Sequence, residues 1–288
     1  MNIEITGKTI LTGLLGSPVA HSISPKIHNE AFRQLGLAYV YLAFDVKKEQ
    51  LQEAVSGLKA INMRGFNLTM PLKVSVLPLL DALSPAAKLA QSVNTVLIKD
   101  QRLTGHTTDG LGYMRSVSEG GFSILGKKMT LLGAGGAAAA ICVQAALDGV
   151  SAIDLFRRNN HSWDRTLAFC HLVAKETGCN ISLYDLADLH QLKASIKEST
   201  ILTNATSVGM APHVDESLIP DTSFLYPELI VSDIIYNPRE TLLLKQAKSI
   251  GCPNFNGLSM LLYQGAEAFR LWTGQDMPTK AIKEKFFS

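Results

Sequence analysis

Cysteine is scarce in this sequence, and its few thiols are too far apart to form a paired framework. The four are Cys142, Cys170, Cys179 and Cys252. They form no C-x-x-C motif and have no histidine cluster beside them. This spacing argues against a disulfide-stabilised secreted domain and against a zinc site, and it favours buried thiols in a reducing compartment. We therefore expect no bound metal.

The sequence also lacks an excess of either charge and any long apolar run. Its formal net charge is only +2, from 27 Lys and Arg against 25 Asp and Glu. This balance gives no support to a nucleic-acid or membrane-surface partner, although a small anion needs only local charge. The N-terminal apolar run is too short for a signal peptide, and no run approaches the length of a membrane span. We expect a cytoplasmic protein, as a monomer or homodimer, without nucleic-acid or membrane partners.

What the sequence does contain is a glycine cluster directly after an apolar run. The run KMTLLGAGGAAA begins at Lys128, and its residues 129–132 predict a buried strand that leads through a tight turn into a helix. Gly133, Gly135 and Ala138 fit the pattern G-x-G-x-x-G/A. In that pattern, small residues allow the turn, the approach of a pyrophosphate and close packing of helix on sheet. We therefore expect a dinucleotide site; the alternative is a flexible turn between any strand and any helix.

The end of the next expected strand bears on the choice of dinucleotide. The strand covers residues 152–156, and the run RRNN follows at 157–160. NAD-specific folds usually carry an acid here for the ribose 2′-hydroxyl, but Asp154 lies inside the strand and is not expected to reach the ribose. Two arginines favour a 2′-phosphate by charge and bidentate geometry, unless they form an ordinary basic loop. We expect NADP to be preferred and NAD to be possible.

Strand and helix patterns alternate through the rest of the second half. We expect helices at about 163–177 and 187–197, and strands at 180–184, 200–204 and 229–234. This rhythm predicts an α/β fold with a Rossmann-type doubly wound parallel sheet. Loops that follow such strands face the ligand, so the loops after the last two strands are candidate cofactor contacts.

The length of the chain favours a second domain. Its 288 residues are too many for one small core. The first part of the chain also contains strand patterns, at 12–16 and 39–45, and predicts a smaller α/β domain. We expect the boundary between the domains within residues 109–126.

Two serines precede a proline at an expected helix start. In the run HSISP, Ser22 and Ser24 are two residues apart, so their hydroxyls project to the same side of an extended segment. Pro25 suits the first helical position, and the positive end of that helix would attract a carboxylate. The alternative is that Ser24 is an ordinary N-cap and that Ser22 faces solvent.

A lysine occupies the first turn of another expected helix. Pro71 fits the first helical position, which places Lys73 beside the positive end of the helix dipole. An acid would be more favourable there, and departures from such local rules concentrate at functional sites. The alternative is a solvated surface lysine.

Polar residues also lie at the margins of two expected strands, 93–99 and 103–108. Asn94 lies at the start of the first strand and Asp109 follows the second, where ligand groups often project. The alternatives are a turn-stabilising side chain for Asn94 and a helix N-cap for Asp109. His106 is assigned no role, because a single histidine near a strand end is more often structural.

The C-terminal part predicts two closing helices. The first is opened by the run NGL at 256–258 and is apolar apart from Gln264, which either faces solvent or needs a hydrogen-bond partner. The second covers about 278–287. The chain contains no internal repeat and no low-complexity segment.

Taken in order, eight separated motifs resemble those of the shikimate dehydrogenase family. They are H-S-x-S-P with the following His28-Asn29, N-x-T-x-P-x-K at 67–73, V-N-T at 93–95, T-D-G at 108–110, G-A-G-G-A-A, the T-x-x-G-M loop, Y-N-P and Y-Q-G-A-E at 263–267. The resemblance covers nearly the whole chain. The W-T-G at 272–274 brings it nearer to the quinate/shikimate branch.

The resemblance implies a reversible NAD(P)-linked reduction of 3-dehydroshikimate to shikimate in aromatic amino-acid biosynthesis. It also implies a substrate domain at 1–112, an NAD(P)-binding domain at 113–254, and C-terminal helices at 255–288 that return to the substrate domain. Quinate stays open as a second substrate. A non-catalytic NAD(P)-sensing protein is the less favoured alternative. Such a protein would not need to keep Lys73 and Asp109, and this sequence contains both.

The resemblance assigns roles to individual residues, with Lys73 and Asp109 as the acid/base pair. The residues implied to bind substrate are Ser22, Ser24, Asn67, Thr69, Lys73, Asn94, Asp109, Tyr236 and Gln264. Those implied to hold the cofactor are Gly133, Ala134, Gly135, Gly136, Ala137, Arg157, Arg158, Asn159, Asn160, Thr206, Ile234 and Gly257. The run RRN at 157–159 departs from the Asn-Arg-Thr of the strict NADP enzymes, which leaves the choice between NADP and NAD open.

Overall fold

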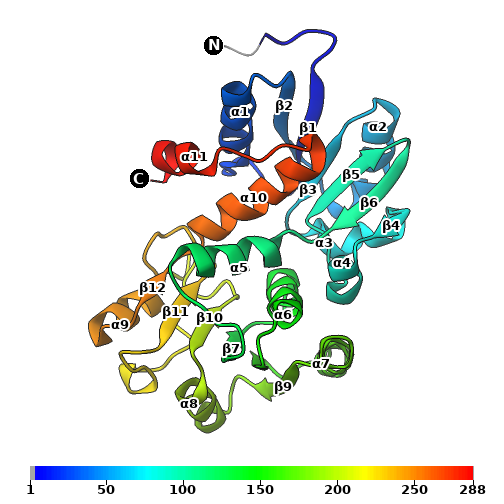
Figure 1. The fold of residues 1–288 in the computed structure, drawn as a ribbon. Coiled ribbons are helices and arrows are strands. Elements are labelled where there is room, and N and C mark those ends of the chain that lie inside the picture. The colour runs from blue at the N-terminus through cyan, green and yellow to red at the C-terminus, as the bar shows by residue number, and fades with distance from the viewer. Residues whose placement is uncertain (1–3, 288) are drawn as a thin grey trace. The chain divides into compact units, whose positions relative to one another are not determined.

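The computed structural model describes residues 4–287, which divide into two compact α/β units (Figure 1). Unit 1 comprises the described residues up to Gly112 together with those from Leu262 onward, and unit 2 comprises Tyr113–Leu261. Each unit is built around its own six-stranded sheet. Mixed α/β architecture is therefore confirmed for both parts of the chain.

The sheet of unit 1 has the strand order β2-β1-β3-β5-β6-β4. Its strands are β1 (Ile10–Gly16), β2 (Tyr39–Asp45), β3 (Gly65–Leu68), β4 (Ala82–Leu83), β5 (Thr95–Lys99) and β6 (Arg102–His106). Strands β1, β2 and β3 are parallel, whereas β5 runs antiparallel to both of its neighbours. Because β5 alone is reversed among these, its first residues lie at the same sheet edge as the last residues of β1, β3 and β6.

Two adjacent residues of β1 show how the helices of unit 1 cover its sheet. Leu14 packs with residues of α1, α10 and α11, and Leu15 packs with residues of α2, α3 and α4. Successive side chains of a strand point to opposite faces, so the sheet is covered on both. The helices are α1 (Ser24–Leu35), α2 (Leu51–Ala60), α3 (Leu72–Ser75), α4 (Pro85–Ala90), α10 (Leu258–Thr273) and α11 (Thr279–Phe286).

The sheet of unit 2 is entirely parallel, with the order β12-β11-β10-β7-β8-β9. Its strands are β7 (Lys128–Leu132), β8 (Ala152–Arg157), β9 (Asn180–Asp185), β10 (Ile201–Asn204), β11 (Ile230–Asp233) and β12 (Asn254–Phe255). The first strand, β7, lies in the middle, and the chain moves outward from it in both directions. This is the doubly wound Rossmann order, as the sequence predicts.

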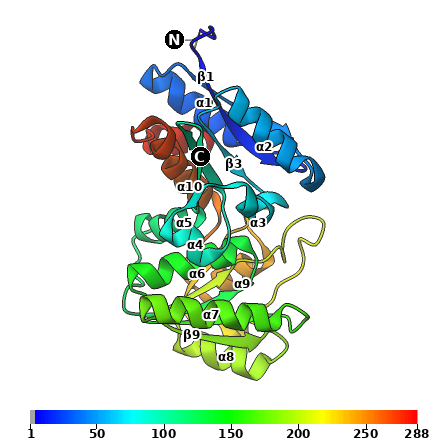
Figure 2. The same ribbon diagram turned by 90° about the vertical axis from the view of Figure 1, so that its right-hand side faces the viewer.

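Helices lie on both sides of this parallel sheet; Figure 2 shows α7 and α8 on opposite sides of β9. The helices are α5 (Asp109–Glu119), α6 (Gly136–Asp148), α7 (Trp163–Thr177), α8 (Leu189–Glu198) and α9 (Leu242–Ile250), and the unit boundaries fall within α5 and α10. Helix α8 begins two residues later than expected, because the Asp188 side chain accepts from the Gln191 N–H and caps it there. All four cysteines are buried and unpaired, as expected.

Within residues 4–287, no group of three or more His, Cys, Asp or Glu side chains is arranged to hold a metal ion. None of the helices in that range combines the length and apolar character needed to cross a membrane.

Candidate active site

Lys73 and Asp109 meet in unit 1, although 36 residues separate them in the sequence. The Lys73 Nζ donates to Asp109 Oδ2 over 2.6 Å. Lys73 is the second residue of the short helix α3, and Asp109 is the first residue of α5. The lysine side chain is 21% exposed and the aspartate side chain 9%. The ion pair is therefore mostly enclosed, yet the amine keeps access to a ligand.

Asn94 holds the second oxygen of the same carboxylate. Its Nδ2 donates to Asp109 Oδ1 at 2.8 Å and also lies 3.3 Å from Gln264 Oε1. Its own Oδ1 accepts from the Thr108 N–H at 2.6 Å. Asn94 is 2% exposed, so water cannot take over these hydrogen bonds if one of the partners is removed. Both oxygens of Asp109 are thus engaged, which fixes the orientation of the carboxylate.

Asn67 extends this network across the sheet. Its Nδ2 donates to the Asn94 carbonyl at 3.1 Å and to Thr95 Oγ1 at 2.9 Å. Its Oδ1 accepts from the Tyr41 hydroxyl at 2.8 Å. A hydrogen-bonded path therefore runs from Lys73 through Asp109, Asn94 and Asn67 to Tyr41.

The two serines lie beside the same sheet edge, after the end of β1. Ser22 Oγ accepts from the Ser24 N–H at 3.3 Å. The N-cap of α1 is Ile23, which makes no side-chain cap, so the alternative that Ser24 is the N-cap is wrong. The first N–H groups of the helix are already engaged, because Ser24 donates to Ser22 and both Lys26 and Ile27 donate to the Ile23 carbonyl. Pro25 has no N–H, so a ligand at this helix start would meet the serine hydroxyls and not free backbone donors. Thr69 follows β3 at this edge and lies against Gly16.

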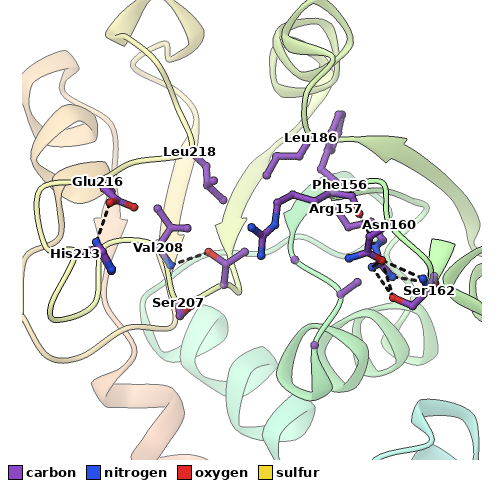
Figure 3. Close-up of a pocket in the computed structure, with 15 residues that line it drawn as sticks. Phe156, Arg157, Asn160, Ser162, Leu186, Ser207, Val208, His213, Glu216 and Leu218 are labelled. Carbon is purple, nitrogen blue, oxygen red and sulfur yellow. Dashed lines mark hydrogen bonds and ion pairs between the residues drawn. The ribbon is translucent and has the colours of Figure 1, made fainter.

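A cavity of about 540 Å³ lies in unit 2, next to the turn that follows β7 (Figure 3). Seven of the expected cofactor residues line it: Gly133, Ala134, Gly135, Arg157, Arg158, Asn160 and Thr206. They come from the ends of β7, β8 and β10, where the chain direction across the sheet changes. Ligands of doubly wound sheets bind at such a switch point.

The glycine turn leaves room for a phosphate. Gly133 has a φ of +113°, and a Cβ there would lie 2.8 Å from the Ala205 carbonyl oxygen. Gly135 precedes α6 as an N-cap without a side chain, and a Cβ there would meet nothing within 4 Å. The open side of Gly135 and the uncapped N–H groups of α6 fit a pyrophosphate.

Arg157 does not present a free guanidinium to the cavity. Its nitrogen atoms donate to the Arg158 carbonyl, to Asn160 Oδ1, to both oxygens of Ser162 and to Thr166 Oγ1. Figure 3 shows Arg157, Asn160 and Ser162 joined on one side of the cavity. No side-chain hydrogen bond or ion pair of Arg158 occurs within residues 4–287. The Arg158 guanidinium can therefore bind a ligand, whereas the Arg157 guanidinium is already hydrogen-bonded within its own loop.

The remaining cofactor residues lie outside the lining of this cavity. Gly136 and Ala137 form the first turn of α6, and the Asn159 N–H donates to Asp185 Oδ1 at 3.3 Å. Gly257 touches Ile234: a Cβ at Gly257 would lie 1.9 Å from the Ile234 carbonyl oxygen.

Two further residues bear on earlier expectations. Tyr236 belongs to unit 2, after β11, whereas the other expected substrate residues belong to unit 1. Asp154 is buried and forms an ion pair with Lys128 at 2.7 Å, in agreement with the expectation that it does not serve the ribose.

Ser207 and Val208 also line the cavity, and they belong to the loop after β10 that the sequence indicates as a candidate cofactor contact. The lining residues that the sequence did not indicate are Phe156, Ser162, Leu186, His213, Glu216 and Leu218. Leu186 follows the end of β9, so the same rule that loops after parallel strands face the ligand applies to it. His213 Nδ1 lies 3.0 Å from Glu216 Oε1, across the cavity from Ser162 (Figure 3). No sequence signal marks these two.

Comparison with known proteins relates the whole chain to one group of enzymes. Residues 14–96 match the model of the shikimate dehydrogenase substrate binding domain, and residues 257–285 match that of the shikimate 5′-dehydrogenase C-terminal domain. The shikimate dehydrogenase (NADP⁺) of Listeria monocytogenes is 51% identical over 284 residues, which is 99% of this chain and 98% of that protein. The quinate/shikimate dehydrogenase of Escherichia coli is 44% identical over 282 residues, 98% of each.

A solved structure shares the fold. The crystal structure of shikimate 5-dehydrogenase from Listeria monocytogenes, in complex with shikimate and NAD, matches with a TM-score of 0.93 at 51% identity. The match covers 97% of each chain.

Proposed function

We propose roles for the residues described above from the premise that this chain belongs to the shikimate dehydrogenase family. The protein is an NAD(P)-dependent oxidoreductase that interconverts 3-dehydroshikimate and shikimate in the shikimate pathway. The observation that carries the residue roles is the enclosed Lys73–Asp109 pair, which a non-catalytic nucleotide sensor would not need.

Unit 1 binds the substrate in this proposal. The domain boundaries are 1–112 for the substrate domain, 113–254 for the NAD(P)-binding domain and 255–288 for the helices that complete the substrate domain. Ser22 and Ser24 bind the carboxylate through their hydroxyls, supported by their position two residues apart at the start of α1. The residues proposed to surround the substrate hydroxyls are Asn67, Thr69, Asn94, Asp109 and Gln264. Tyr236, from unit 2, is proposed to approach the substrate.

Lys73 acts as the general acid in reduction. When bound, the reduced nicotinamide supplies a hydride to the carbonyl carbon, and the carbonyl oxygen then carries the developing negative charge. The Lys73 ammonium stabilises that charge and donates a proton to give the hydroxyl. In oxidation the neutral amine accepts the hydroxyl proton. Asp109 orients the amine, because its Oδ2 accepts from Nζ at 2.6 Å.

Unit 2 holds the dinucleotide, with NADP preferred and NAD possible. The pyrophosphate lies against Gly133–Ala137, and Thr206, Ile234 and Gly257 contact the rest of the cofactor. Arg158, rather than Arg157, pairs with the 2′-phosphate, because the Arg157 guanidinium is already used by its own loop. Asn159 and Asn160 are neutral and do not repel the phosphate.

Quinate is a second candidate substrate. The observation that favours it is the 44% identity with the quinate/shikimate dehydrogenase of Escherichia coli. We also propose a cytoplasmic location, which the four unpaired cysteines support, and a monomeric or homodimeric state without nucleic-acid or membrane partners.

Nicotinamide absorbance tests the proposal directly. Purified protein is mixed with shikimate or quinate and with NAD⁺ or NADP⁺, and formation of the reduced nicotinamide is followed. Turnover of shikimate with NADP⁺ is expected to be the fastest of the four combinations. An absence of turnover with both acids would instead support a nucleotide-sensing protein.

A further inference from the structure

Two adjacent residues of α1, His28 and Asn29, both contact Tyr41 in β2. The Asn29 side chain donates from Nδ2 to the Tyr41 carbonyl at 2.8 Å and accepts the Tyr41 N–H on Oδ1 at 2.9 Å. Strand β2 is at the edge of its sheet, with β1 as its partner on one side. The Asn29 side-chain amide thus makes the two backbone hydrogen bonds that a further strand would make at Tyr41. These bonds hold the Tyr41 backbone in place.

His28 fixes the ring of the same tyrosine. The two rings are stacked, with centroids 4.3 Å apart and planes inclined by 2°. Trp272 closes the cluster at 5.5 Å from His28 and 6.0 Å from Tyr41. Tyr41 is 0% exposed and His28 1%, so neither ring can turn without disturbing a close-packed core. Complete burial lowers the pKa of His28 to about 3, and the ring is therefore neutral near pH 7.

The Tyr41 hydroxyl acts on a residue of the proposed substrate site. It donates to Asn67 Oδ1 at 2.8 Å. Burial raises the pKa of Tyr41, so the hydroxyl keeps its proton and remains a donor. Both Nδ2 hydrogens of Asn67 are directed to protein oxygens, on Asn94 and Thr95. Asn67 can therefore offer a ligand only the second lone pair of Oδ1.

We propose that His28 and Asn29 are positioning residues for substrate binding: together they hold Tyr41, whose hydroxyl fixes Asn67 as an acceptor for a substrate hydroxyl. This inference rests on the proposed function, since it presumes that Asn67 binds shikimate. In this proposal, His28 and Asn29 affect substrate binding through Tyr41 and not by direct contact. Their effect on substrate binding must therefore disappear when Asn67 is replaced.

A double-mutant cycle with Asn29→Ala and Asn67→Ala tests this dependence. In the parent background, Asn29→Ala is expected to raise KM for shikimate about fivefold, the factor that one neutral hydrogen bond contributes. The KM for NADP⁺ is expected to stay within about twofold, because the bond affects substrate alone. In the Asn67→Ala background, Asn29→Ala is expected to change KM for shikimate by less than about twofold. An equal effect in both backgrounds overturns the proposal.

The stacking contact has its own variants. His28→Phe keeps a flat ring and is expected to retain the parent KM for shikimate, whereas His28→Ala is expected to raise it. If both variants raise KM for shikimate equally, His28 does not act by stacking on Tyr41. Ile282→Ala is the matched structural control, because Ile282 is buried in the same core but comes from α11. A rise in KM for this control would show that general loosening explains the effect, and would also overturn the proposal.

Two measurements keep the outcomes separable. Tyr41→Phe removes only the hydroxyl and preserves the stack, so it replaces Asn29→Ala in the cycle if that variant does not fold. Turnover of shikimate by the parent protein is measured first. If the parent is inactive, the proposed function fails, whereas an active parent with additive variants rejects the positioning role alone.

Discussion

The Lys73 amine and the Asp109 carboxylate are 2.6 Å apart, and Asn94 donates to the other oxygen of that carboxylate at 2.8 Å. Each of the three residues comes from the same edge of the unit 1 sheet. The aspartate is held on both sides, so it can orient the amine without a change in its own position. In the proposed mechanism, the Asp109 carboxylate therefore keeps its position and charge while the Lys73 amine exchanges a proton with the substrate.

Replacement of the lysine should separate chemistry from cofactor binding. Lys73→Ala is expected to lower kcat by about 10² or more, because the proton donor is lost. The Kd for NADP⁺ is expected to be unchanged, since the nucleotide residues belong to unit 2. Steady-state kinetics and nucleotide fluorescence titration measure the two effects, with Lys88→Ala as a surface control. Turnover within a few fold of the parent would remove Lys73 from the mechanism.

The two arginines after β8 should respond differently to replacement. Arg158→Ala is expected to raise KM for NADP⁺ about tenfold or more and to leave KM for NAD⁺ unchanged, because a charge-assisted contact to the 2′-phosphate is lost. Arg157→Ala is expected to raise both KM values, since it removes the contacts that hold residues 158–166. If Arg158→Ala affected both cofactors equally, the assignment of the 2′-phosphate would be wrong.

Stability should depend on pH through His28. Its pKa is about 3 in the folded protein and near 6.5 in the unfolded chain, so the unfolded state binds a proton first as the pH falls. The free energy of unfolding is therefore unaffected above pH 6.5 and decreases below it, by about 2 kcal/mol between pH 6.5 and pH 5. Urea unfolding at pH 7 and pH 5 measures the change.

His28→Phe removes this titration and should make the decrease smaller. A smaller slope remains, because burial also lowers the pKa of His106. An identical slope in His28→Phe and the parent would contradict the assignment.

Two glycines should respond in opposite ways to an added methyl group. Gly257→Ala would place its Cβ 1.9 Å from the Ile234 carbonyl oxygen, and it is expected to destabilise by about 2 kcal/mol or more. Gly57→Ala lies within α2, where a Cβ meets nothing within 4 Å, and is expected to stabilise by about 0.5–1 kcal/mol. Urea unfolding compares them; a neutral Gly257→Ala would show that the backbone at Ile234 can move away.

The long elements of this fold are predictable because their apolar residues repeat with one period over many positions. Strands β4 and β12 contain two residues each, which is too few for any period to be visible. Helices α4 and α9 are not predicted either, although Ser84 and Thr241 are their N-caps. The patterns after these caps cover only six and nine residues, which leaves little of a helical period to detect.

The candidate site was predictable where a residue type conflicts with its local setting, as Lys73 does at a helix start. It was not predictable where contacts depend on the sheet. Thr95 and Tyr41 are ordinary strand residues in the sequence, and only the pairing of β5 with β3 and of β2 with β1 brings them to Asn67. His213 and Glu216 reach the cavity through a loop whose course no local signal determines.

Strand β1 carries adjacent leucines into two separate cores, with Leu14 on one face and Leu15 on the other. A deletion or insertion of one residue in this strand would exchange the faces of every residue beyond it. Side chains that pack in one core of unit 1 would then point into the other core. The segment with Ser22 and Ser24 would also be shifted by one residue along β1. Natural variation in length is therefore expected in the loops of unit 1 and not within β1.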